Sequence, residues 1–188
     1  MPYIALINDL INDKAKVHFC GKRYGKNEIE LIEDREPDSK IRISGVPDNT
    51  IVINLDDFFP APDQIFAGSR CECCRADYIL ISATGNDRQI VFIELKKEDD
   101  DNSHIKKQLL GAEAFSHYCV ALLKLFWEKE FPLHKFQKHF VCFKYTNSEK
   151  RGTDCDAKVS ANNTVQNMLK LEGSHTFQYN RLIARKPK

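Results

Sequence analysis

The chain contains 188 residues, of which 42% are hydrophobic and 29% are charged, with a formal net charge of +1. This length supports a substantial core, and we expect one domain across residues 1–188. A net charge near zero argues against binding of duplex nucleic acid through overall basicity. Residues 1–4 do not begin a secretory signal and no continuous apolar stretch has membrane-spanning length, so we expect a cytoplasmic protein without membrane contact.

The first third of the chain predicts helices followed by strands. Apolar residues recur at near-helical spacing over residues 3–13 and again over residues 26–34, and we expect a short helix at each. Alternation with period two predicts strands over residues 40–44 and 50–55. Residues 56–70 contain prolines and a glycine, which is typical of an irregular connection.

A hairpin is predicted next. Two apolar runs, at residues 76–81 and 90–96, flank a segment rich in turn formers. If the turn is centred directly after Gly85, residues opposite each other have numbers that sum to 171. Asp77 then lies opposite Glu94, so the hairpin itself pairs two carboxylates.

The rest of the chain predicts one long helix and further strands. Acidic residues followed by a serine are typical of the start of a helix, and we expect a helix over residues 103–130. Gly111 lies in the interior of this helix and indicates close packing there. Residues 139–143 predict a strand, residues 164–171 a short helix and residues 176–183 a last strand. Strands that alternate with a covering helix are typical of a layered α/β domain.

The hairpin residues suit metal-assisted phosphodiester hydrolysis. Successive side chains of a strand point to opposite faces, so Glu94 and Lys96 share a face. Asp77 and Glu94 offer two carboxylates and the carbonyl of Leu95 offers a third oxygen, the donors that Mg²⁺ prefers. Lys96 can orient a water or neutralise charge in the transition state. Such triplets also occur on solvated edge strands, but the apolar run before Glu94 favours a central strand.

The pattern of Asp77 followed by Glu94-Leu95-Lys96 resembles the signature of the PD-(D/E)XK nuclease superfamily, which is restriction-endonuclease-like. The resemblance implies an α/β fold with an αβββαβ core, a central mixed sheet flanked by helices. The core would cover about residues 26–145, with a C-terminal extension over residues 146–188. It also implies a Mg²⁺-dependent endonuclease, with Mn²⁺ as a substitute. DNA is favoured over RNA as its substrate, but the sequence does not decide between the two.

The resemblance implies further site residues. Gln108 matches a glutamine that many members carry early in the following helix, where it positions water or phosphate; a surface polar residue is the alternative interpretation. Members also use an acidic residue from the preceding helix, and Glu28, Glu30 and Glu33 are all candidates. Nothing in the sequence selects one of these three.

The biological setting is implied by analogy alone. Size and charge resemble those of an effector of an anti-phage or restriction-type system that acts with a protein partner or as a homodimer. The alternative hypothesis is a non-catalytic nuclease-fold subunit that serves as an interaction module in a larger complex.

Three cysteines lie just before Asp77. Cys71 and Cys74 have the spacing of a zinc-ligand pair, but the sequence shows no second pair, so it does not favour Zn²⁺ at this place. Together with Cys73 they also suit small buried residues, exposed thiols or a redox switch.

Overall fold

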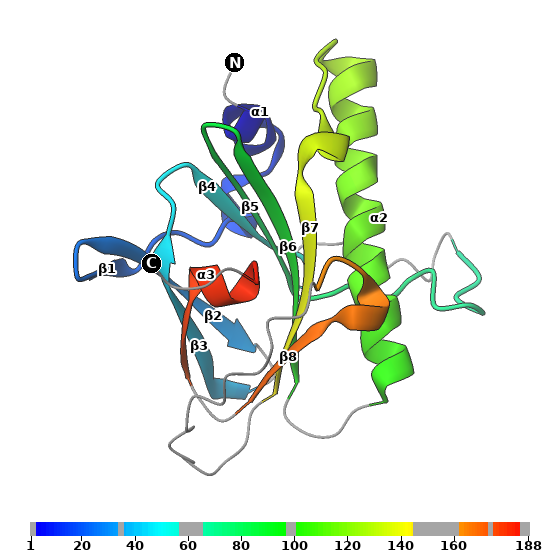
Figure 1. The fold of residues 1–188 in the computed structure, drawn as a ribbon. Coiled ribbons are helices and arrows are strands. Elements are labelled where there is room, and N and C mark those ends of the chain that lie inside the picture. The colour runs from blue at the N-terminus through cyan, green and yellow to red at the C-terminus, as the bar shows by residue number, and fades with distance from the viewer. Residues whose placement is uncertain are drawn as a thin grey trace.

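The computed structural model describes residues 3–33, 36–56, 66–96, 101–144, 162–172 and 175–184, except for the side chains of residues 33 and 36–39. The helices and strands follow the order α1 (Tyr3–Leu10), β1 (Gly21–Arg23), β2 (Lys26–Glu33), β3 (Glu36–Val46), β4 (Thr50–Asn54), β5 (Tyr78–Thr84), β6 (Asp87–Lys96), α2 (Asn102–Phe126), β7 (Gln137–Lys144), β8 (Leu169–Glu172), β9 (Thr176–Gln178) and α3 (Tyr179–Leu182) (Figure 1). Short 3₁₀ helices lie at Asp13–Ala15, Leu133–Lys135 and Val165–Asn167.

The described residues form a mixed α/β protein with two mixed sheets and three α-helices. One sheet has the strand order β4-β5-β6-β7-β8 and the other the order β1-β2-β3-β9. In the first sheet, β5 is antiparallel to both neighbours, whereas β7 and β8 run parallel to β6. The carboxyl ends of β6, β7 and β8 therefore meet at one edge of the five-stranded sheet.

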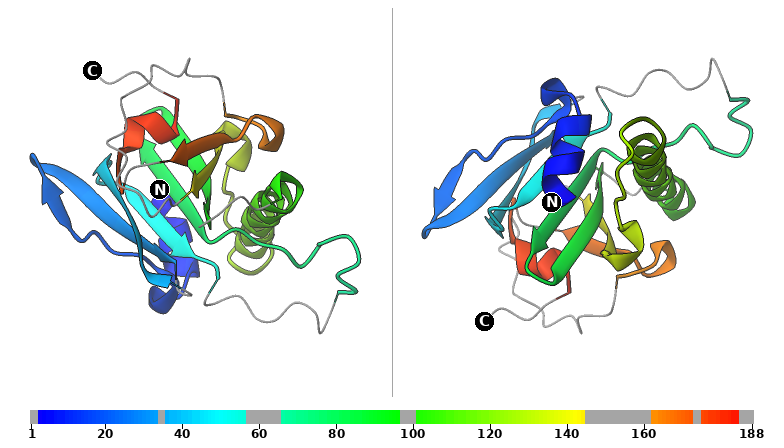
Figure 2. Two further views of the ribbon diagram at one scale, coloured as in Figure 1. Left: turned by 90° about the horizontal axis from the view of Figure 1, so that it is seen from below. Right: turned by 90° about the horizontal axis from the view of Figure 1, so that it is seen from above.

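The five-stranded sheet is the middle layer of the molecule. Helices α1 and α2 cover one of its faces and the four-stranded sheet covers the other (Figure 2). In β6, Ile90 and Phe92 face the helices, while Val91 and Ile93 face the second sheet. Burial on both faces explains why β6 is a nearly unbroken apolar run rather than an alternating one.

The predicted hairpin register is confirmed. All seven residue pairs of β5 and β6, from Tyr78–Ile93 to Thr84–Asp87, have numbers that sum to 171. Asp77 is the residue directly before β5, so it continues this register toward Glu94. The register was predictable because a short turn fixes it locally.

Other predicted elements are wrong in type or extent. Residues 26–33 form the strand β2 instead of a helix, and β2 buries Ile29 and Leu31 with period two. The segment predicted as a helix over residues 164–171 is a 3₁₀ turn followed by β8, and the last predicted strand is β9 followed by α3. Both α1 and α2 lie on the same face of the sheet rather than on opposite faces. Most of the predicted connection over residues 56–70 lies outside the described residues.

Helix α2 begins where the sequence predicts and ends at Phe126, four residues early. The Asp101 side chain caps it by accepting from the amide of Ser103 at 2.9 Å. Its Gly111 is closely packed as predicted, because an added Cβ would lie 1.8 Å from the carbonyl oxygen of Cys74.

An 18-residue window of α2 has a mean hydropathy of 1.3. By length and composition the helix therefore meets a criterion for a membrane span, contrary to the expectation from sequence. Core helices of soluble proteins meet the same criterion, and 28% of this window is buried inside the described part of the chain.

Candidate active site at the carboxyl edge of the five-stranded sheet

Asp77 is held by the backbone of two neighbouring strands. Its Oδ2 accepts a hydrogen bond from the amide of Leu95 in β6 at 2.6 Å. Its carbonyl oxygen accepts from the amide of Leu55, just after β4, at 2.8 Å. These two bonds fix both the main chain and the carboxylate of Asp77 at the start of β5. A carboxylate oriented through one oxygen can bind a cation through the other.

Glu94 is a fully buried carboxylate, with 0% of its surface exposed. The Nζ of Lys96 lies 2.9 Å from its Oε1, and the Lys96 side chain is 20% exposed. Removing a carboxylate from water costs several kcal/mol, so Glu is seldom fully buried without a partner. The ion pair with Lys96 offsets part of this cost and links the two residues of the predicted triplet.

The predicted residues face the same side of the sheet. In β6, Glu94 and Lys96 point to the same face of the sheet as Phe92. Asp77 points to the same face as Ile79 in β5. Phe92 and Ile79 both pack toward the helices. Directly opposite residues of an antiparallel pair have Cβ atoms about 4.5–5.5 Å apart. The hairpin therefore brings the two carboxylates and the lysine to the face of the sheet that α2 covers.

Gln108 lies in the second turn of α2 and is half-buried. Its Oε1 atom is buried and has no hydrogen-bond partner within the part of the chain that the structure describes. Ile105 and Leu109 beside it are fully buried against the sheet. A buried acceptor of this kind is costly in a core and suits a group that binds a water or a ligand.

Three lysines lie around Cys142, the sheet neighbour of the buried Glu94. Cys142 of β7 pairs with Glu94 in the sheet register. Burial, and after it the negative charge of Glu94, raises the pKa of the Cys142 thiol to about 12. The opposing positive charges that act on this thiol come from Lys144, Lys170 and Lys96. Lys96 and Lys144 are the last residues of β6 and β7, and Lys170 is the second residue of β8.

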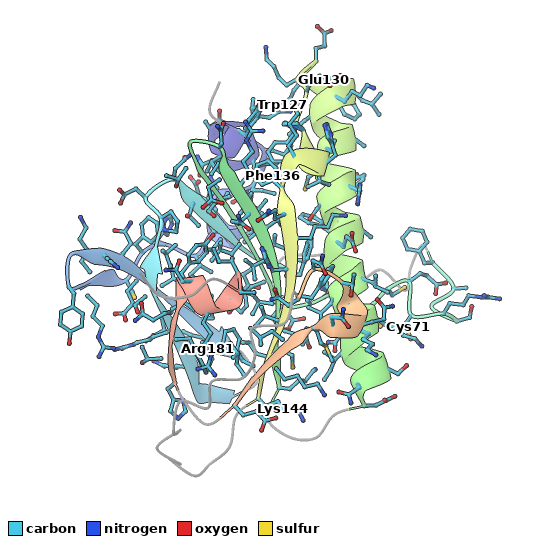
Figure 3. The ribbon with its side chains drawn as sticks, in the orientation of Figure 1. Cys71, Trp127, Glu130, Phe136, Lys144 and Arg181 are labelled. Carbon is cyan, nitrogen blue, oxygen red and sulfur yellow. The ribbon has the colours of Figure 1, made fainter. Side chains whose placement is uncertain are left out.

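The contacts of two of these lysines tie the site to its surroundings. The Nζ of Lys144 lies 3.9 Å from Oε1 of Glu172, and its side chain is 12% exposed. The Nζ of Lys170 donates to Oδ1 of Asn102, the first residue of α2, at 2.5 Å. Figure 3 shows Lys144 at the lower end of β7. Sequence reasoning did not identify Lys170, because nothing local indicates that β8 pairs with β7.

Glu28 and Glu30, two of the three acidic residues expected from an upstream helix, do not reach this site. They belong to β2, where Ile29 and Leu31 fill the space between the sheets, so Glu28 and Glu30 lie on the outer face of the second sheet. Glu30 is paired there with Arg42 at 2.9 Å, which lowers the pKa of its carboxyl. The side chain of Glu33 lies outside the described residues. The expectation failed because the segment is a strand in a different sheet.

The structure places a histidine beside the cysteine pair. Ligand atoms of Cys71, Cys74 and His104 all lie within 4.8 Å of one another. His104 belongs to the first turn of α2, 30 residues after Cys74, which is why the sequence spacing did not identify it. A hollow of about 310 Å³ is lined by residues such as Leu10, Ile53 and Leu55, and the amide of Leu55 is the donor to the carbonyl of Asp77.

Searches against models of known protein families, against curated proteins and against solved structures found no match to the chain.

Proposed function

We propose that the chain is a metal-dependent nuclease of the PD-(D/E)XK type that hydrolyses phosphodiester bonds, in DNA rather than RNA. The observation that carries this proposal is the fully buried Glu94, paired with Lys96 at 2.9 Å and facing the same side as Asp77. A buried carboxylate costs stability, and proteins retain such groups where function requires them.

The order of elements around the five-stranded sheet supports the proposal. Taken along the chain, α1, β4, β5, β6, α2 and β7 follow the order αβββαβ, with β7 parallel to β6. Strands β1 to β3 are inserted between α1 and β4. The departure is that a second sheet, rather than a helix, covers the face opposite α2.

The donor set fits a hard divalent cation. Asp77 and Glu94 offer carboxylate oxygens and Leu95 offers a carbonyl oxygen, which suit Mg²⁺, with Mn²⁺ as a substitute. When bound, such a cation polarises a phosphoryl oxygen and lowers the pKa of a water. The Leu95 amide holds the Asp77 carboxylate in one orientation, so the site does not have to reorganise as it fills.

The remaining residues act on water and phosphate. Lys96 neutralises Glu94 and lies where it can stabilise the negative charge that develops on the phosphate. The Oε1 of Gln108 can accept a hydrogen bond from a water and so orient it for attack. Lys144 and Lys170 extend the positive charge along the carboxyl edge, where a nucleic-acid backbone can bind.

Cleavage assays test the proposal directly. Supercoiled plasmid, duplex and single-stranded oligonucleotides and RNA are incubated with the parent chain in Mg²⁺ or Mn²⁺. We expect Asp77→Asn, Glu94→Gln and Lys96→Met each to lower the rate at least about 100-fold. Glu30→Gln, a carboxylate change on the outer face of the second sheet, is the matched control and should cleave normally. If all three site variants cleave as well as the parent, the proposal is wrong.

Metal binding gives a readout that does not depend on finding the right substrate. A cation that binds only the folded chain stabilises it by about 2.7 kcal/mol at 100 times its dissociation constant. We expect Mg²⁺ or Mn²⁺ to raise the Tm of the parent and of Glu30→Gln, and to leave that of Glu94→Gln unchanged.

The alternative function is a non-catalytic interaction subunit. The net charge of +1 and the exposed side chains at the end of α2, Leu125, Phe126 and Trp127, favour contact with a protein partner. Calorimetric titration with Mg²⁺ and Mn²⁺ separates the two functions. Absence of binding together with absence of cleavage supports the interaction subunit.

A further inference from the structure

The segment of residues 66–76, called here the cysteine loop, leads from the region before β5 to Asp77. We propose that Cys71 and Cys74 of this loop, together with His104 of α2, bind a zinc ion. Their three ligand atoms lie within 4.8 Å of one another. In tetrahedral zinc sites the bond lengths place ligand atoms about 3.5–3.8 Å apart, so these atoms need to approach by about 1.3 Å at most.

The donor chemistry selects zinc. Two thiolates and one imidazole are the ligands that Zn²⁺ prefers, whereas Mg²⁺ prefers oxygen. The Nζ of Lys107 lies 3.5 Å from the Sγ of Cys71, where it can donate to a coordinated thiolate. Such a hydrogen bond to a ligand atom orients it and offsets part of the negative charge that two thiolates bring.

The backbone of the cysteine loop directs both sulfurs to the same place. The amide of Cys74 donates to the carbonyl of Cys71 at 3.0 Å, and the amide of Cys71 donates to the carbonyl of Gly68 at 3.1 Å. Cys71 has φ +61°, a left-handed conformation that is uncommon for a residue other than glycine. Two successive turns thus form the Cys-x₂-Cys unit.

The loop lies along one stripe of α2. His104, Lys107 and Gly111 are three and four residues apart and share a side of the helix. Lys107 contacts Cys71, and Gly111 lies against the carbonyl of Cys74, so the loop follows the helix for two turns. Figure 3 shows Cys71 beside α2.

Few apolar contacts hold the loop in this place. Within the described residues 66–76, Ala76 is fully buried, while Phe66 is 54% exposed. A structural metal commonly provides the stability that so small an apolar contact cannot. We infer that zinc fastens the loop to the first turn of α2.

The described part of the chain supplies three of the four ligands of a tetrahedral zinc ion. No described residue supplies the fourth ligand. X-ray absorption of the zinc protein should therefore count two sulfurs, with nitrogen or oxygen at the remaining positions. The proposal does not depend on nuclease activity. Its consequence for the site is positional, because Asp77 follows Cys74 by three residues and Gln108 follows His104 by one turn.

Zinc content of the purified full chain is the first measurement. We expect about one zinc per chain in the parent, and loss of that zinc in Cys71→Ser, Cys74→Ser and His104→Ala. The matched controls are Cys73→Ser in the same loop and His117→Ala, an exposed histidine of the same helix, and both should keep their zinc.

Two further measurements keep the test decisive if a variant fails to fold. Cobalt added to the metal-free parent should give a thiolate-to-cobalt charge-transfer band and the intense visible bands of a tetrahedral site. Zinc should also protect Cys71 and Cys74 from alkylation while exposed Cys20 still reacts. A parent chain without zinc, without the cobalt bands and without protection overturns the proposal, as does a Cys71–Cys74 disulfide in protein purified under reducing conditions.

Discussion

Replacing Gly111 with alanine tests whether the cysteine loop is seated on α2. An added Cβ would lie 1.8 Å from the carbonyl oxygen of Cys74, 2.7 Å from its carbonyl carbon and 3.1 Å from the Cα of Arg75. All three atoms belong to the backbone, so no side-chain rotation relieves the contact. The carbonyl must retreat by about 1.6 Å to reach an ordinary contact distance of 3.4 Å.

Two opposing free-energy changes decide the sign of this substitution. Alanine favours the helix over glycine by about 0.8–1 kcal/mol. Overpacking against a fixed neighbour typically costs about 1–3 kcal/mol, and this contact is with backbone, so the upper part of that range applies. We expect Gly111→Ala to lose about 1–2 kcal/mol, which lowers the Tm of a chain this size by about 2–8 °C.

Thermal unfolding followed by circular dichroism measures the shift, and limited proteolysis within residues 66–76 reports release of the loop. His117→Ala is the control, since it improves helix propensity at an exposed position of the same helix. We expect Gly111→Ala to weaken zinc binding as well. If Gly111→Ala is as stable as the parent and keeps the same proteolytic pattern and zinc content, the loop does not pack on α2 as described.

Three further predictions concern stability, each measured by urea unfolding. Asn162→Ala should cost about 2–4 kcal/mol, because buried Asn162 bonds the ring of His139 at 2.8 Å and its loss leaves buried polar groups unpaired; a cost below 1 kcal/mol contradicts this. Tyr78→Phe should cost about 1–3 kcal/mol, because its hydroxyl joins the two sheets through the amide and carbonyl of Ile32, at 3.2 and 2.6 Å; an unchanged midpoint contradicts this. Burial raises the pKa of the Cys119 thiol from 9.0 to about 12, so above pH 9 the unfolded chain loses this proton first and stability falls by about 1.4 kcal/mol per pH unit. Cys119→Ala should remove that part of the slope between pH 9 and 11, and an identical slope in both chains contradicts the assignment.

The hairpin and its site were predictable because the information is local. The runs that become β5 and β6 and the turn at Gly85 fix the register, and the register places Asp77 toward Glu94. The start of α2 was predictable for the same reason, since Asp101 and Ser103 form the cap themselves. Local turn and cap chemistry does not depend on the rest of the fold.

The strand β2 was mistaken for a helix because its apolar residues fit two periods. Ile29 with Ile32 suits a helix, whereas Ile29 with Leu31 suits a strand, and the structure buries the second pair. The available local signal was Gly25, which has φ +75° in the two-residue turn between β1 and β2. Pairing with β3 and packing on the other sheet decide that the segment is a strand and not a helix. Neither contact can be read from the eight residues of β2 alone.

Residues brought together from distant parts of the chain could not be predicted. β8 joins β7 across a long connection, and β9 pairs in parallel with β3 more than 130 residues earlier. Lys170 reaches the candidate site only through the first pairing. His104 reaches Cys71 only because the cysteine loop folds back along α2. Neither pairing leaves a pattern in either segment alone.

The two proposed metal sites differ in the cation that their donors prefer. The hairpin site depends on the zinc site for its position, whereas the zinc site does not depend on Glu94. Oxygen donors at Asp77 and Glu94 suit a hard cation, whereas two thiolates and an imidazole suit zinc. Only two residues separate Cys74 from Asp77, and Ala76 between them is fully buried, so displacement of the loop passes directly to the start of β5. Glu94, in contrast, is held within β6 and paired with Lys96. Loss of zinc should therefore weaken cleavage, while Glu94→Gln should abolish cleavage and leave zinc in place. The opposite pattern, in which Glu94→Gln releases zinc, would show that the two donor sets form a single site.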